Sequence, residues 1–329
     1  MPSHSSALTT LLAVTAALFI KATAAHKNPS TMSSAHNHAL QNILNTAQSN
    51  PLYTYPTDFT QDIQPKPFHS HNDYWRPLPF YTALAAGATS IEADVWLHNS
   101  TLYVGHDESS LSPARTLESL YINPLLDVLA RQNPTPLIIS PGPDQRKNGV
   151  FDTAPGQTMN LLIDLKTDGA ETWPYVLRAL EPLRQANYLT TYKDNTLTSG
   201  PITVIGTGNT PLPQVQAANP RDAFYDAKLP LLSTTQSNLD PSVAPLASTS
   251  FGRQFGEVRG LTLNATQTQI LHEQISVAHS KGMDVRYWDQ PEWPVGTRNA
   301  MWRLLWDAGV DYLNVDDLEA AAGFWEMEG

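Results

Sequence analysis

Short β-prone runs alternate with amphipathic, helix-prone stretches from Pro67 to the end of this 329-residue chain. Strands separated by helices run parallel in one sheet, because each helix carries the chain back across a face of the sheet. Eight such runs predict a (β/α)8 TIM barrel, an α/β fold of about 250 residues that leaves room for an N-terminal extension. The predicted strands are 67–72, 89–97, 159–166, 201–207, 222–229, 245–251, 283–288 and 311–316, and the predicted helices are 78–87, 116–131, 171–186, 268–281 and 297–308.

The composition allows a large core and excludes several classes of protein. Hydrophobic residues make up 41% of the chain and the formal net charge is −11, so the chain is not disordered and general binding of nucleic acid is disfavoured. The chain has no cysteine, which excludes disulfides, thiol catalysis and zinc fingers. The motifs of dinucleotide binding, zinc proteases and serine hydrolases are incomplete or missing.

The N-terminus predicts export from the cell. Residues 7–20 are uncharged and mostly apolar, and small residues follow at 22–25, so we interpret residues 1–25 as a cleaved signal peptide and an uncleaved signal anchor as the weaker alternative. The protein would then be secreted or held at the cell wall. Residues 26–65 predict a polar, loosely ordered extension with one short helix at 38–48, and the barrel domain would span 66–329. The triplets at Asn99 and Asn264 are candidate glycosylation sites.

Carboxylates occupy alternate positions in two of the predicted strands. Glu92 and Asp94 point to one face of their strand, and Asp164 and Lys166 share a face of the next strand of the barrel. Buried carboxylates are costly unless a positive charge neutralises them. Oxygen ligands suit Mg²⁺ or Ca²⁺, so the pattern predicts a divalent cation held by these carboxylates, with the lysine beside it as an anion-binding group.

Two histidines lie at or just after the ends of predicted strands near these carboxylates. His71 lies at the end of the first predicted strand, and His106 follows the strand that carries Glu92 and Asp94. Two imidazoles beside a metal and a lysine are typical of general acid–base catalysis on a phosphoryl group. His69 receives no chemical role, although its place next to His71 leaves the assignment open. Each histidine taken singly could also be a structural loop residue.

The order of these motifs resembles the phospholipase-C-like phosphodiesterases, which include glycerophosphodiester phosphodiesterases and sphingomyelinase D. The stretches HNDYW (71–75), EADVWL (92–97), GHD (105–107), RTLESLY (115–121) and GVFDT (149–153) resemble most the fungal family called altered inheritance of mitochondria protein 6. The resemblance implies Mg²⁺ as cofactor and a phosphodiester substrate such as a phospholipid head group. It also implies the following roles: Glu92, Asp94 and Asp164 as metal ligands, His71 and His106 as the catalytic pair, and Lys166, Asn72 and Trp288 as substrate-binding residues.

Several alternatives stay open at this point. A sphingomyelinase D-like enzyme would form a cyclic phosphate instead of hydrolysing the diester. A barrel glycosidase would use Glu92 or Asp94 together with Asp164, and a non-catalytic secreted protein would keep only the fold. Asp316 and Asp317 end the last predicted strand, and we interpret them as caps of the following helix in preference to site residues. The oligomeric state stays undetermined.

Overall fold

The computed structural model describes residues 38–47, 50–53, 55–134, 146–258 and 260–325. The proposed signal peptide, 1–25, lies outside these ranges. The described chain forms two compact units that divide after residue 54. In the first unit, α1 (His38–Thr46) is an amphipathic helix with no buried residue, and the 3-10 helix η2 (Pro51–Tyr53) follows it.

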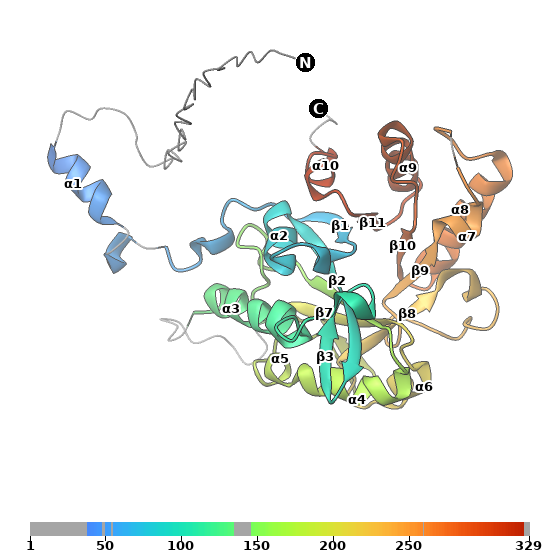
Figure 1. Ribbon diagram of the computed structural model, residues 1–329, viewed down its shortest axis with the longest axis horizontal. Coiled ribbons are helices and arrows are strands. Elements are labelled where there is room, and N and C mark those ends of the chain that lie inside the picture. Colours follow the sequence, from blue (N-terminus) through green and yellow to red (C-terminus); the bar gives the residue numbers. More distant parts are fainter. Residues whose placement is uncertain (1–37, 48–49, 54, 135–145, 259, 326–329) are drawn as a thin grey trace, which may run out of the picture. The chain divides into compact units, whose positions relative to one another are not determined.

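The second unit contains a closed barrel of eight parallel strands (Figure 1). Each of these strands pairs with its neighbour in the order of the chain, and β1 pairs with both β2 and β11, so that the eight parallel strands close on themselves. This confirms the predicted (β/α)8 fold. The barrel strands are β1 (Lys66–Ser70), β2 (Ala88–His98), β4 (Met159–Leu165), β7 (Ile202–Gly208), β8 (Ala223–Lys228), β9 (Leu246–Ser250), β10 (Asp284–Trp288) and β11 (Tyr312–Val315).

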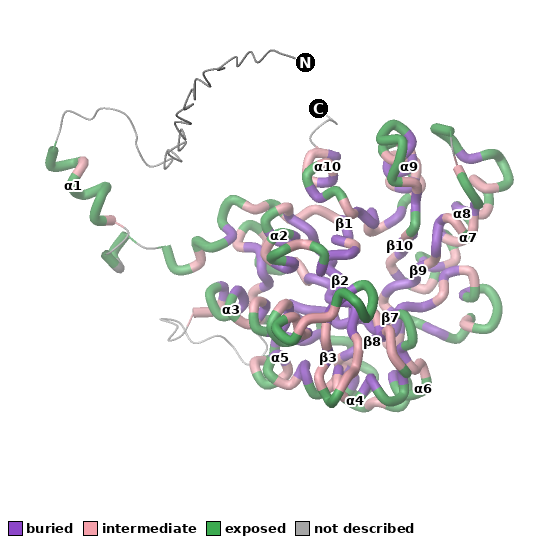
Figure 2. The backbone as a smooth tube through the Cα atoms, viewed as in Figure 1, coloured by how far each residue is buried: buried purple, intermediate pink, exposed green. Residues whose placement is uncertain are grey.

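Helices surround the barrel, and their apolar faces pack on the outer side of the strands. Figure 2 shows buried residues concentrated along the strands and exposed residues on the outer surfaces of the helices. No described helix has both the length and the apolar character needed to cross a membrane. The α-helices of this unit are α2 (Pro79–Ala86), α3 (Asn123–Gln132), α4 (Gly169–Ala179), α5 (Glu181–Gln185), α6 (Leu212–Ala217), α7 (Phe251–Phe255), α8 (Ala265–Ser280), α9 (Val295–Asp307) and α10 (Leu318–Ala322).

The elements differ from the predicted ones in several places, and the helices α6, α7 and α10 were not predicted. The segment 116–131 forms a π-helical turn, η6 (Glu118–Ile122), before α3. The segment 171–186 divides into α4 and α5, with Pro182 in the first turn of α5.

The structure also contains strands outside the barrel. Strand β2 turns back through Asn99 and Ser100, both with positive φ, into the antiparallel strand β3 (Thr101–Val104). Strands β5 (Thr191–Lys193) and β6 (Thr196–Thr198) form a separate hairpin. Between β8 and β9 the described chain has only the 3-10 helix η7 (Leu229–Leu231).

Side chains inside the barrel change from apolar to polar along the strands. Leu162, Ile205 and Leu246 form a small apolar cluster of their own, distinct from the large core beneath the helices. Two residues beyond Leu162 in β4, Asp164 lies directly opposite Asp94 of β2. Because side chains alternate in a strand, the residues that precede these two aspartates, Ala93 and Ile163, point outward and belong to the large core beneath the helices. The carboxyl ends of the strands therefore present polar groups above an apolar layer.

Candidate active site

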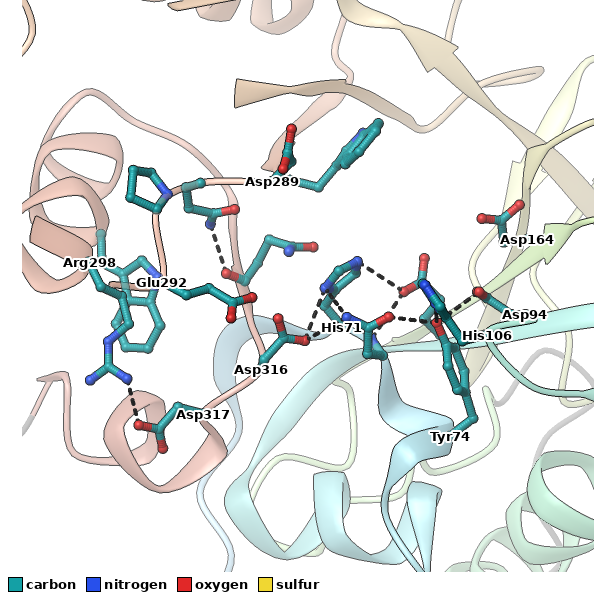
Figure 3. Close-up of a pocket in the computed structure, with 17 residues that line it drawn as sticks. His71, Tyr74, Asp94, His106, Asp164, Asp289, Glu292, Arg298, Asp316 and Asp317 are labelled. Carbon is teal, nitrogen blue, oxygen red and sulfur yellow. Dashed lines mark hydrogen bonds and ion pairs between the residues drawn. The ribbon is translucent and has the colours of Figure 1, made fainter. Parts of the chain in front are cut away.

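A cavity of about 510 Å³ opens at the carboxyl ends of the barrel strands (Figure 3). Barrel enzymes place their chemistry at this end, where loops from several strands meet. His71, Glu92, Asp94, His106, Asp164 and Trp288, six of the residues singled out in the sequence, line this cavity. Closure of the barrel thus brings together residues that lie up to 217 positions apart in the sequence.

Three carboxylates form a cluster on two neighbouring strands. Each of Glu92, Asp94 and Asp164 offers one oxygen, and the three oxygens lie within 4.8 Å of one another. Glu92 and Asp94 are buried, and Asp164 is half-buried. The register that places Asp94 opposite Asp164 results from the parallel pairing of β2 with β4.

Lys166 lies against this cluster. Its Nζ is 2.8 Å from Asp94 Oδ2 and 2.6 Å from Asp164 Oδ2. One ammonium does not balance three carboxylates: burial, together with the nearby charges of Glu92 and Asp164, raises the pKa of Asp94 to about 8. Burial likewise raises the pKa of Asp164, against the opposing effect of Lys166.

The donor set fits a divalent cation. The cluster offers several oxygens in one place, which suits a hard cation such as Mg²⁺ or Ca²⁺. A second positive charge would also relieve the repulsion that disfavours ionised Asp94 and Asp164. Within the described residues this is the one group of three or more such side chains close enough to share an ion.

His71 is positioned by groups on both sides of its ring. Its Nδ1 lies 3.0 Å from Asp316 Oδ1, and its Nε2 lies 3.8 Å from Glu92 Oε2. Burial alone would lower the pKa of His71, but the carboxylates of Glu92 and Asp316 outweigh burial and raise the pKa above its usual value. An imidazole held by a carboxylate at one nitrogen presents its other nitrogen in a fixed direction.

His106 reaches the cavity from the loop after β3, and its side chain is exposed. Its Nδ1 lies 3.2 Å from the hydroxyl of Tyr74, and its ring stands 5.5 Å from that of Trp75. The Tyr74 hydroxyl is also 2.8 Å from Asp94 Oδ2. Tyr74 therefore connects the second histidine to the carboxylate cluster.

His69 lies below the site and does not line the cavity. Its side chain is fully buried, with Nδ1 2.7 Å from Ser90 Oγ and Nε2 3.7 Å from Glu92 Oε2. Burial and the nearby charge of Arg286 lower the pKa of His69 to about 4, so it is a neutral support for Glu92. A side chain in this place does not reach a substrate in the cavity.

Asn72 and Asp316 belong to the hydrogen bonds around His71, whereas Asp317 caps a helix. Asn72 adopts a left-handed backbone, which Asn tolerates better than most residues, and its side-chain amide donates to Asp316 Oδ1 at 3.1 Å. Asp317 accepts from Ala320 N and caps α10, as interpreted from the sequence. Asp316 is not a cap: its carboxylate bonds His71 instead, so the sequence interpretation was wrong for this residue.

Three residues that shape the site, Tyr74, Gly208 and Arg286, received no role from the sequence. Tyr74 stands three positions after His71 in the stretch HNDYW, and this position could have marked it as a site residue. Gly208 ends β7 with φ of 61°, and a Cβ there would lie 1.8 Å from Asp164 Oδ1. Arg286 is buried, and its Nη1 donates to Asn314 Oδ1 at 2.9 Å. No local pattern marks either of the last two.

The two candidate glycosylation sites lie on the surface. Asn99 is exposed at the turn between β2 and β3, and Asn264 is exposed at the start of α8, where its side chain accepts from Gln267 N. Both places are accessible to a modifying enzyme.

Comparison with known proteins agrees with this site. An AIM6-like phosphodiesterase domain matches residues 57–226, which include every residue of the carboxylate cluster and both cavity histidines. The fold and the site thus define a barrel protein of the phosphodiesterase type.

The relatives then identify the family. A homologue of altered inheritance of mitochondria protein 6 from Arthroderma benhamiae is 50% identical, over 87% of this chain and 92% of the relative. The protein of that name from Eremothecium gossypii is 36% identical, over 78% of this chain and 68% of the relative. The chain belongs to the altered inheritance of mitochondria protein 6 family, as the resemblance of its motifs predicted.

A solved structure gives a weaker likeness. A glycerophosphoryl diester phosphodiesterase from Parabacteroides distasonis matches with a TM-score of 0.41 and 13% identity, covering 82% of this chain and 90% of that one. A likeness at this level carries no argument about substrate.

Proposed function

We propose that this protein is a metal-dependent phosphodiesterase that cleaves a glycerophosphodiester or a phospholipid-type head group. The observation that carries the proposal is the meeting of Glu92, Asp94 and Asp164 within 4.8 Å, with His71 and His106 lining the same cavity. A glycosidase needs two carboxylates but neither a lysine paired with them nor two histidines. The phosphodiesterase domain of the family supports the same choice.

The side chains divide the chemistry among them. One imidazole of the pair takes a proton from the attacking water, and the other gives a proton to the leaving oxygen, so that no strong base or acid is released. Asp316 keeps His71 oriented, and Tyr74 does the same for His106. Lys166 offers a positive charge to the non-bridging oxygens of the phosphodiester.

Glu92, Asp94 and Asp164 would hold the divalent cation. When bound, such an ion neutralises the charge that develops on the phosphoryl oxygens in the transition state. Mg²⁺ is the proposed ion, and Ca²⁺ is the alternative that the same oxygen donors accept.

Phosphorus NMR of the products tests the proposal. The full chain is incubated with glycerophosphodiesters and lysophospholipids, with Mg²⁺, with Ca²⁺ or with a chelator. We expect a phosphomonoester signal that disappears with the chelator. A cyclic phosphate signal would assign the protein to cyclising transfer instead, and no turnover of any diester would favour the non-catalytic barrel.

We also propose that the protein enters the secretory pathway. The uncharged segment 7–20 and the small residues after it support this proposal, as does the exposure of Asn99 and Asn264. N-terminal sequencing of the protein from its native host should give a mature chain that starts after Ala24 or Ala25. A chain that retains residues 7–20 would contradict cleavage and favour the signal anchor.

A further inference from the structure

A second cavity of about 660 Å³ adjoins the first. His71, Glu92, Asp164 and Trp288 line both cavities. The proposed catalytic centre therefore lies where the two cavities meet, and a diester bound there would extend one of its two alcohol groups into each.

Three basic side chains line the second cavity. Lys228 ends β8, and Arg253 lies on α7. Within the described part of the chain, neither side chain has an acidic partner within 4.0 Å. Arg286 of β10 is only 3% exposed, its Nη2 is 3.9 Å from Asp226 Oδ2, and its Nε has no hydrogen-bond partner. This N–H is enclosed by the protein, so Arg286 contributes a buried positive charge to the cavity wall and not a donor that a ligand can reach.

The acidic groups of this cavity do not balance these charges. Among the described residues, its acidic lining residues are Glu92 and Asp164, and the proposed cation and Lys166 neutralise both. Asp226 offsets the charge of Arg286, which leaves Lys228 and Arg253 without a balancing acid. The first cavity is the reverse: Asp289, Glu292, Asp316 and Asp317 line it. Arg298, the one arginine among its described lining residues, is paired with Asp317 at 2.6 Å. The two sides of the catalytic centre therefore differ in charge.

We propose that the second cavity binds a further anionic group of the substrate, a carboxylate or a phosphomonoester, on one side of the scissile phosphodiester. Lys228 and Arg253 hold this group, and the buried positive charge of Arg286 adds to their attraction. The inference rests on the proposed function and deepens it, because it selects diesters with a second negative charge over neutral ones. The shared chemistry is an oxyanion that these donors can satisfy.

Two pairs of diesters test the inference, since the members of each pair differ by one anionic group. Glycerophosphoserine differs from glycerophosphoethanolamine by a carboxylate, and glycerophosphoinositol 4-phosphate differs from glycerophosphoinositol by a phosphomonoester. Affinities are measured by calorimetry with Mg²⁺ on the full-length His106→Ala protein, in which turnover is slow, and kcat/KM is measured on the parent. We expect the more anionic member of at least one pair to be preferred by about tenfold.

Variants then locate the preference. Lys228→Gln and Arg253→Gln should each lower the affinity ratio within the preferred pair by about threefold. Lys193→Gln is the matched control: it removes a charge from the exposed end of β5, away from both cavities, and should leave the ratio unchanged. Arg286 is left intact because its replacement would disturb the buried contact with Asp226.

Each outcome separates the alternatives. A preference in the serine pair alone assigns a carboxylate, and one in the inositol pair alone assigns a phosphomonoester. Equal affinities within both pairs would overturn the inference. So would an equal loss of affinity for both members in the variants, because the cations would then hold the scissile phosphate. A preference in binding without turnover of any diester would keep the anion subsite and contradict the phosphodiesterase proposal.

Discussion

His71 and His106 are the residues on which the proposed chemistry depends most directly. Both line the cavity, and hydrogen bonds to Asp316 and Tyr74 hold them there. Replacing either by Ala should lower kcat by about 10²- to 10⁴-fold, the usual contribution of a positioned proton transfer, and should change the melting temperature little. Steady-state kinetics on a phosphodiester and thermal melts measure both quantities.

Two other histidines complete this test. His272→Ala is the neutral control, because His272 is exposed on α8. His69→Ala should act through stability instead, by about 2 kcal/mol, since it removes a fully buried side chain that supports Glu92. Full activity in both His71→Ala and His106→Ala would contradict the paired-imidazole mechanism.

Gly208 is a second residue whose replacement is informative. A Cβ at this position would meet Asp164 Oδ1 at 1.8 Å, and the positive φ disfavours any other residue. Gly208→Ala should therefore displace Asp164 and weaken Mg²⁺ binding by at least about tenfold. Calorimetry with Mg²⁺ checks this, and Gly156→Ala, where a Cβ meets nothing within 4 Å, is the control. Unchanged Mg²⁺ affinity in Gly208→Ala would remove Asp164 from the metal site.

At the scale of elements, the amino ends of β10 and β11 contain a pH-sensitive carboxyl. Burial and the nearby charge of Asp311 raise the pKa of Asp284 to about 6. Because this is above the unfolded value, the folded state holds the proton more tightly, and the resulting stability is fully present below pH 4. It is lost as the pH rises through 6, at a cost of about 2 kcal/mol.

The Asp284→Asn variant tests this effect, since an amide imitates the protonated carboxyl. The free energy of unfolding of the variant, relative to the parent, should increase between pH 4 and pH 7.5 by about 2 kcal/mol. Urea unfolding at several pH values measures the difference. A constant difference across this range would show that Asp284 titrates alike in the folded and unfolded chain.

At the scale of the whole molecule, the proposed cation connects two strands of a closed barrel. An ion that binds only the folded state stabilises it by about 2.7 kcal/mol at a hundred times its Kd. We therefore expect saturating Mg²⁺ to raise the melting temperature by about 5 °C, and a chelator to reverse the increase. Asp164→Asn should abolish the Mg²⁺ effect, and an equal increase in that variant would show that the ion binds elsewhere.

Local sequence patterns were enough to predict the barrel and the core of the site. Alternation within a strand is local, so the spacing of Glu92 and Asp94 already placed both carboxylates on one face. The eight predicted strands all occur, because apolar β-prone runs such as 161–163 between helical stretches leave few other arrangements. The family was recognisable from the sequence because its motifs are short, local and occur in a fixed order.

Which distant residues meet depends on the closed barrel and does not follow from local patterns. Asp316 lies 245 positions from His71 in the chain yet bonds its imidazole, and no local pattern separates it from the neighbouring cap, Asp317. The buried Arg286 and the positive φ of Gly208 likewise became visible only in the closed barrel. The physical reason is that strand register and barrel closure set these contacts jointly, whereas the periodicity of a segment fixes only which face a side chain takes.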